Sequence, residues 1–254
     1  MNVEMRELLV KSSVDGTMQP NLFYESDRTN RPLLVGLHTW SHNRFNQVDR
    51  LMPLAKRNSW NLLLPEFRGA NHGDNPYCRD ACGSPKAKQD IIDAVEYVKE
   101  HYDIDADNIL LLGASGGGHM ALLMAAYAPK LWKAVCSFVP ITDIEKWHEE
   151  NENYRCAIEA CCGMDKTKYA VRSPINYIDD IAKSNIKIYS GKWDNIVPCH
   201  HGLDIYNEIF KKHPDANVYF EMFDGGHEML IDDAEKWLIA HMDPSKLSHI
   251  TVTG

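Results

Sequence analysis

The segment GASGGG at residues 113–118 constrains the fold of this chain more than any other. It follows the apolar run Ile109–Leu112 and leads into the helix-like segment His119–Ala128. A serine between a buried strand and a helix sits on a sharp turn that pushes its hydroxyl out of the sheet, and small neighbours let the backbone pack closely. A GxSxG match is weak on its own, but the strand before it and the helix after it make Ser115 a candidate nucleophile.

Short apolar runs recur along the chain and alternate with helical patterns. They read as strands covered on both faces: Leu33–Leu37, Trp60–Pro65, Ile109–Leu112, Ala134–Val139, Ile186–Ser190 and Val218–Phe223. Before them, Glu7–Ser13 and Met18–Glu25 flank an Asp-Gly turn typical of a β-hairpin. The helical patterns are centred on Val48–Ala55 and Ile91–Tyr102, with further helices after Ser115, near His201 and around Asp233–His241. We therefore predict an α/β fold with a mostly parallel sheet of about eight strands flanked by helices.

One interval interrupts this alternation. Residues 141–177 are polar, mixed in charge and rich in aromatic residues, and they exceed a normal crossover in length. We interpret them as a small helical insertion over the carboxyl end of the sheet. Such a segment forms either a lid or wall of a substrate pocket, or an extended crossover connection on the protein surface.

Length and charge indicate a single domain over residues 1–254. A chain of 254 residues that is 44% hydrophobic can bury a large core. Its net charge of −9 disfavours nucleic acid or an anionic membrane as a partner but allows a small neutral substrate. The N-terminus lacks the basic residues of a signal peptide, and no apolar run reaches membrane-spanning length. Nothing in the sequence indicates an oligomeric state.

The cysteines favour a cytoplasmic location. Seven cysteines are an odd number for a disulfide framework and suit reduced thiols. The two groups Cys78–Cys82 and Cys156–Cys162 lack the paired CxxC spacing of a zinc site. We expect ordinary buried thiols or a local disulfide there, and no bound metal.

A serine hydroxyl is a poor nucleophile at neutral pH and requires a histidine base held by a carboxylate. Among twelve histidines, His227 follows the strand Val218–Phe223 in the glycine-containing turn Asp224–His227. Asp194 follows the strand Ile186–Ser190, which we expect beside the strand that precedes His227. Asp224 is a rival acid, but it is too close in sequence to His227 to lie on a separate strand end. The order Ser115, Asp194, His227 is that of a catalytic triad on this type of sheet.

Acyl transfer also needs hydrogen-bond donors for the oxygen that becomes negative in the tetrahedral intermediate. The Gly116 amide follows the nucleophile directly and supplies one donor. The second should come from the loop after Leu33–Leu37, which reads His38, Thr39, Trp40, Ser41, His42. We predict the Trp40 N–H as this donor, with Thr39 as the fallback.

Four segments together resemble the α/β-hydrolase fold, and more narrowly the catalytic domain of the prolyl oligopeptidase (S9) family. They are GASGGG, RSPINY at 172–177, GKWDNIVP at 191–198 and DGGH at 224–227, and the resemblance also takes in FRG at 67–69. It implies the same triad: Ser115 as nucleophile, Asp194 as acid and His227 as base.

Two departures from the family pattern affect the expected function. The chain leaves no room for the β-propeller that family peptidases usually add, and Thr39, Trp40 and Ser41 replace a glycine-rich oxyanion loop. Compact domains of this type are similar to many small carboxylesterases and deacetylases, and ester cleavage needs less leaving-group protonation than amide cleavage. We therefore expect a carboxylesterase or deacetylase acting on small acyl esters without a cofactor. A peptidase of S9 type on short peptides and a non-catalytic binding protein remain the alternatives.

Overall fold

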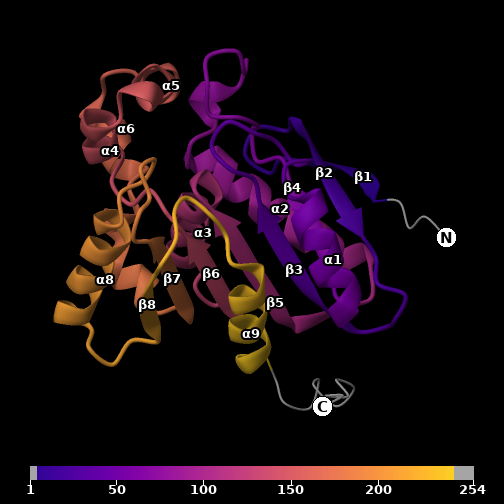
Figure 1. Ribbon diagram of the computed structural model, residues 1–254. Coiled ribbons are helices and arrows are strands. Elements are labelled where there is room, and N and C mark those ends of the chain that lie inside the picture. The colour runs from indigo at the N-terminus through magenta and orange to yellow at the C-terminus, as the bar shows by residue number, and fades with distance from the viewer. Residues whose placement is uncertain (1–4, 243–254) are drawn as a thin grey trace.

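The computed structural model describes residues 5–242 and builds them around one eight-stranded sheet (Figure 1). The strand order is β1-β2-β4-β3-β5-β6-β7-β8. The strands are β1 (Arg6–Lys11), β2 (Met18–Tyr24), β3 (Arg31–Leu37), β4 (Asn61–Pro65), β5 (Ile104–Ala114), β6 (Ala134–Phe138), β7 (Ile186–Gly191) and β8 (Val218–Phe223). The predicted fold class, a mostly parallel α/β-hydrolase sheet of about eight strands, is confirmed.

Helices cover both faces of the sheet. On one face α2, α3 and α8 pack into one apolar core, and on the other face α1 and α9 pack into a second. The helices of these two layers are α1 (Val48–Asn58), α2 (Pro85–His101), α3 (Gly116–Tyr127), α8 (His200–Lys212) and α9 (Ile231–Ala240). The inner strands are buried on both sides, as their continuous apolar runs predict.

The parallel strands bring their carboxyl ends to one edge. Only the pairings β1–β2 and β2–β4 are antiparallel, whereas β4, β3, β5, β6, β7 and β8 pair in parallel. The loops that follow β3, β5, β7 and β8 therefore meet at the same end of the sheet. These are the loops in which the sequence places the candidate site residues.

One strand differs from its prediction. Strand β5 begins at Ile104, five residues before the apolar run that identified it, and its register with β3 shifts between Pro32 and Leu33. Its first residues include the exposed Ala106 and Asp107, so the apolar pattern reveals only the later, buried part of the strand.

The interval 141–177 is a helical insertion, as predicted. It contains α4 (Ile144–Glu150), α5 (Glu152–Cys162), α6 (Lys166–Val171) and the 3-10 turn η2 (Pro174–Tyr177), and α7 (Ile178–Ile181) leads from it to β7. A second 3-10 turn, η1 (Cys78–Asp80), lies against α5. Figure 1 shows α4, α5 and α6 gathered in a group beyond one end of the sheet.

The insertion has an apolar core of its own. Trp147, Ile158 and Tyr169 pack there with Trp40 from the loop after β3 and Val197 from the loop after β7. The insertion is therefore anchored to two loops at the carboxyl edge. Whether it moves as a lid stays a prediction.

Three further predictions concern the cysteines, membrane-spanning segments and the extent of the domain. All seven cysteines are free thiols. Within residues 5–242, no helix is long and apolar enough to cross a membrane. The prediction of one domain over residues 1–254 extends beyond the described residues at both ends and stays a prediction.

A buried ion pair ties the N-terminal hairpin to α2. The Arg68 and Asp90 side chains are each 1% exposed, and Arg68 Nη2 donates to Asp90 Oδ1 at 3.1 Å. Arg68 Nη1 also donates to Asp15 Oδ2 at 2.9 Å, and Ser12 Oγ donates to Asp90 Oδ1 at 2.6 Å. Hydrogen bonding to Arg68 holds the pKa of Asp15 well below its usual value. Arg68 thus serves the fold and lies away from the Ser115 cavity.

We predict that Asp90→Ala lowers the free energy of unfolding by about 3–5 kcal/mol, because it leaves the Arg68 guanidinium buried without its main partner. Urea unfolding followed by tryptophan fluorescence measures the change. Glu208→Ala is the control: it removes a surface pair with Lys211 and should cost at most about 1 kcal/mol. Equal losses for the two variants would contradict the role given to the buried pair.

Candidate active site

Ser115 lies on the turn between β5 and α3 with a positive φ. Its φ is 57° and its ψ is −122°. The Ser115 N–H donates to Phe138 O at 2.9 Å, and the His119 N–H donates to Ser115 O at 2.8 Å. A non-glycine residue rarely adopts a positive φ and is held there only by its surroundings. These bonds fix the turn that the GASGGG segment predicts.

Glycines allow this turn to pack against its neighbours. A Cβ at position 113 would lie 2.1 Å from Gly117 O, and a Cβ at position 116 would lie 2.5 Å from Trp40 N. Real Cβ atoms essentially never approach other atoms this closely, so a side chain at either position would force the neighbouring backbone to shift. The second contact brings the backbone of the loop after β3 directly beside the start of α3.

Asp194 is a fully buried carboxylate with three hydrogen bonds. Its Oδ1 accepts from the N–H groups of Ile196, at 2.8 Å, and Val197, at 2.9 Å, and its side chain is 0% exposed. Its Oδ2 lies 2.7 Å from His227 Nδ1. Because an ionised carboxylate can only accept, Nδ1 carries the proton and donates, which leaves a lone pair on His227 Nε2. This is the tautomer that a general base requires.

The loop after β8 holds His227 in place. The Trp193 N–H donates to Gly225 O at 2.9 Å, which ties this loop to the one that carries Asp194. The rival acid Asp224 accepts a hydrogen bond from Trp193 Nε1 at 2.7 Å. Asp194, and not Asp224, contacts His227.

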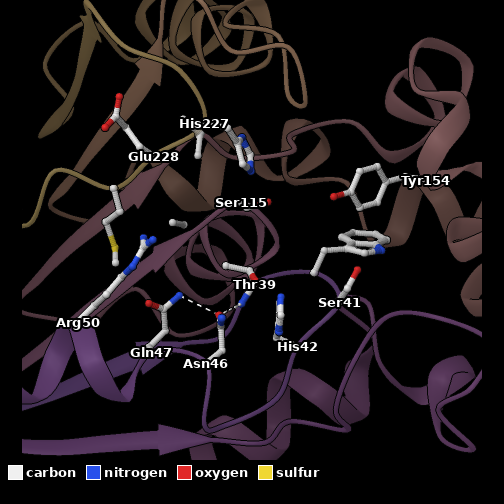
Figure 2. A pocket seen from close by; sticks show the side chains of 14 residues that line it. Thr39, Ser41, His42, Asn46, Gln47, Arg50, Ser115, Tyr154, His227 and Glu228 are labelled. Atoms are coloured by element: carbon white, nitrogen blue, oxygen red, sulfur yellow. Dashed lines mark hydrogen bonds between the residues drawn. The ribbon is translucent and has the colours of Figure 1, made fainter.

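Ser115 and His227 line the same cavity, which has a volume of about 360 Å³. Figure 2 shows the His227 ring beside Ser115 at one end of this cavity. The structure thus brings together the three side chains predicted from Ser115, Asp194 and His227. Their catalytic roles stay a prediction.

Two backbone N–H groups near Ser115 have no acceptor within the described part of the chain. They belong to Gly116, whose N–H is the first of α3, and to Trp40. The Thr39 N–H, by contrast, donates to Asn46 Oδ1 at 3.0 Å. Of the two donors considered from this loop, the Trp40 N–H is therefore the one left available for an oxyanion.

Polar side chains make up most of the remaining lining. They come from the loop after β3, from α1 and from the loop after β8: Thr39, Ser41, His42, Asn46, Gln47, Arg50 and Glu228. The apolar lining residues are Trp40, Ala114, Val139, Tyr154 and Met229. Tyr154 comes from α5, so the insertion forms one wall of the cavity.

Four other aromatic or basic residues of nearby segments have different surroundings in the structure. Tyr154 lines the cavity, while the buried Trp147 packs edge-on against the Trp40 ring at 4.8 Å. Arg68 forms the ion pair with Asp90, and together with His72 it lines a different cavity. Asn46 was missed: a lone asparagine in a polar loop carries no signal of the backbone group that it binds.

Two other histidines near the carboxyl edge are unsuited to the role of base. His38 is buried, and its ring nitrogens each lie 2.9 Å from a carbonyl oxygen, of Thr39 and of Glu66. Burial lowers its pKa. Burial also lowers the pKa of His119 to about 4, and its Nε2 lies 2.6 Å from Arg172 O. Neither is among the cavity-lining residues.

Comparison with known proteins identifies the family. A profile of the prolyl oligopeptidase family, Peptidase S9, matches residues 54–242. The chain belongs to this family. It is accordingly a serine hydrolase of the S9 family, as the GxSxG, Asp and His segments predicted.

Curated relatives are similar over most of this chain but are much longer. Acylamino-acid-releasing enzyme 1 of Oryza sativa subsp. japonica is 24% identical over 195 residues, which cover 70% of this chain and 25% of the relative. Acylamino-acid-releasing enzyme 2 of the same organism is 21% identical over 226 residues, 82% of this chain and 29% of the relative. The chain spans about a quarter of the length of the first of these relatives.

Solved structures share the fold at low sequence identity. The acylaminoacyl peptidase of Pyrococcus horikoshii superposes with a TM-score of 0.74 and 18% identity, over 93% of this chain and 39% of its own. The Pyrococcus furiosus esterase PF2001 superposes with a TM-score of 0.73 and 16% identity, over 95% of this chain and 92% of its own. Peptidases and esterases thus have the same fold as this chain.

We predict that Asp194→Asn lowers kcat for a chromogenic ester by about 10⁴-fold, because an amide in place of the carboxylate favours the wrong His227 tautomer. Steady-state kinetics on p-nitrophenyl acetate measures the loss. Asp224→Asn is the matched control and should change kcat only a few-fold, as its carboxylate binds Trp193. The assignment fails if Asp224→Asn costs as much as Asp194→Asn.

We also predict that Gly116→Ala lowers kcat by about 10²-fold with the fold retained, because the added Cβ must push the Trp40 amide away from the site. The same ester assay checks the rate, and a thermal melt checks the fold. Gly73→Ala is the control, since the nearest atom to its Cβ is Ala160 Cβ at 3.7 Å. An unchanged kcat for Gly116→Ala would argue against an oxyanion site between these two amides.

Proposed function

We propose that this S9-family protein is a carboxylic ester hydrolase that cleaves small acyl esters through a covalent acyl-enzyme. The observation that carries the proposal is the His227–Asp194 pair at 2.7 Å beside Ser115, in a cavity flanked by two backbone amides that have no acceptor among residues 5–242. A nucleophile, an oriented base and an oxyanion site are the components that acyl transfer requires.

In the proposed mechanism, His227 Nε2 removes the proton from Ser115 Oγ as this oxygen attacks the substrate carbonyl carbon. The Gly116 and Trp40 N–H groups donate to the carbonyl oxygen as it becomes negative. Collapse of the tetrahedral intermediate expels the alcohol, which takes the proton from His227, and leaves an acyl group on Ser115. Water activated by His227 then releases the acid, and Asp194 stabilises the imidazolium in both steps. No metal or organic cofactor takes part in this scheme.

The cavity favours short acyl groups. Its volume is about 360 Å³, and seven of its lining residues besides Ser115 and His227 are polar. A long alkyl chain would gain little from such a lining, because burial against polar groups does not stabilise apolar surface. The Trp40 ring, which is 2% exposed and packed against Trp147, further limits the space.

A peptidase acting on N-acylated substrates is the second candidate. Two findings support it: the similarity to acylamino-acid-releasing enzymes and the match to the profile of the Peptidase S9 family. The difference in chemistry lies in the leaving group, since an amine must be protonated more completely than an alkoxide before it leaves. The partner expected in either case is a small ester or a short peptide.

Matched substrates distinguish the two candidates. We predict a higher kcat/KM for p-nitrophenyl acetate and butyrate than for p-nitrophenyl octanoate, and little cleavage of N-acetyl-alanine p-nitroanilide. Feruloyl esters, aminoacyl esters and an acetylated sugar extend the panel. A kcat/KM for the anilide equal to that for the esters would favour the peptidase. Amide bonds are intrinsically harder to cleave, so equal values would mean that the site assists amide cleavage specifically.

Ser115→Ala tests the mechanism itself. The variant should lose nearly all turnover on every substrate that the wild type cleaves and should no longer be labelled by a fluorophosphonate, with an unchanged thermal melt. The residual rate should be that of the oxyanion site and binding alone, about 10³-fold above water or less. A wild-type protein that is neither labelled nor active on the panel would instead fit a non-catalytic binding protein.

A further inference from the structure

Two histidines and a carboxylate cluster where α4 meets α8. Glu150 ends α4, and His200 and His201 begin α8. One ligand atom of each side chain lies within 4.8 Å of the other two. Glu150 Oε2 is 3.1 Å from His200 Nε2 and 3.4 Å from His201 Nε2. None of the three is among the described residues that line the Ser115 cavity.

His201 Nε2 is the atom that points to a ligand. The His201 side chain is 1% exposed, and its Nε2 has no hydrogen-bond partner within residues 5–242. Native structures rarely leave a buried polar atom without a partner. The partly exposed Glu150 and His200 face the same point, with side-chain exposures of 31% and 36%.

Thr142 offers a partner for the second ring nitrogen of His201. Thr142 Oγ1 donates to His201 O at 2.8 Å and lies 3.3 Å from His201 Nδ1, so it can accept a proton carried on Nδ1. That tautomer leaves the Nε2 lone pair directed at the cluster. The Thr142 N–H also lies 3.3 Å from Nδ1 and favours the other tautomer, in which Nε2 carries the proton. A cation bound at Nε2 would therefore shift this proton to Nδ1.

We propose that Glu150, His200 and His201 bind a divalent transition-metal ion, with Zn²⁺ as the best match. Two imidazole nitrogens and one carboxylate oxygen form a donor set that suits zinc, with the remaining position open to water. Mg²⁺ and Ca²⁺ prefer sites made of oxygen atoms and fit this set less well. The sequence did not indicate this site, because Glu150 is distant in sequence from the two histidines.

The ion would tie the insertion to the loop that carries Asp194. Trp147 Nε1 and Asn151 Nδ2, on either side of Glu150, both donate to Ile196 O, at 3.0 and 2.8 Å. The Ile196 N–H in turn donates to Asp194. A metal at the start of α8 adds a second tie to the far end of the same loop. The role proposed for the ion is structural: as its ligands, Glu150 and His200 would help to hold this loop in position.

Titration with Co²⁺ tests the proposal on the intact chain. We expect the wild type to bind one Co²⁺ with the visible absorption of a low-symmetry nitrogen and oxygen site, and Zn²⁺ to displace it. Glu150→Gln and His200→Asn should each weaken binding by more than about tenfold. Both side chains are partly exposed, so these variants should fold, and a thermal melt without metal confirms it. Zn²⁺ should raise the Tm of the wild type but not of Glu150→Gln.

Glu159→Gln is the matched control. Glu159 pairs with His148 at 2.8 Å in the same insertion but belongs to no three-residue cluster in the described part of the chain, so its substitution should leave Co²⁺ binding unchanged. The free thiols are competing ligands, and they would produce an intense thiolate-to-cobalt charge-transfer band. Three results would each overturn the proposal: no Co²⁺ binding by the wild type, binding unchanged in Glu150→Gln and His200→Asn, or a spectrum dominated by that band.

Discussion

The parallel pairing of β7 with β8 is the constraint on which the candidate site depends. Ile186 pairs with Val218 and Gly191 with Phe223, so the two strands end together and their loops start side by side. This register lets a buried Asp194 carboxylate meet the His227 ring, and the Trp193 N–H bond to Gly225 O holds the loops at that spacing. The β5–β6 pairing does the same for Ser115, whose N–H binds Phe138 O. The geometry of the candidate site here follows from strand order.

Much of this arrangement could be predicted because it follows from local patterns. Six apolar runs gave the parallel strands, and an Asp-Gly turn gave the hairpin, since burial and a positive φ each leave a mark on residue type. The prediction of burial on both faces was wrong for the edge strand β8, where Tyr219 and Met222 are exposed. The positions of Ser115, Asp194 and His227 followed from a topological rule: each comes directly after a strand, and parallel strands share a carboxyl edge. The insertion at 141–177 was recognisable because it breaks the alternation.

Other features could not be predicted, since they depend on contacts between distant segments. The bond from the Thr39 N–H to Asn46 occupies one of the two candidate donors and involves a backbone group that no residue type reveals. The early start of β5 at Ile104 is hidden by the polar residues between Asp105 and Asn108. The meeting of Glu150 with His200 and His201 depends on how the insertion folds back onto α8, which composition does not encode.

The residue at position 40 contributes to the candidate site through both its peptide group and its side chain, so the two cannot change independently. Its peptide group abuts the start of α3, where a Cβ at Gly116 would displace it, and its indole ring closes one side of the cavity against Trp147. Changing the Trp40 side chain to admit bulkier substrates would disturb the peptide group beside it. A broader substrate range would then be accompanied by a lower rate of turnover. Diversification of substrate range within this architecture should therefore proceed through α5, which contributes Tyr154 to the cavity from a segment separate from the loop after β3 and from the Ser115 turn.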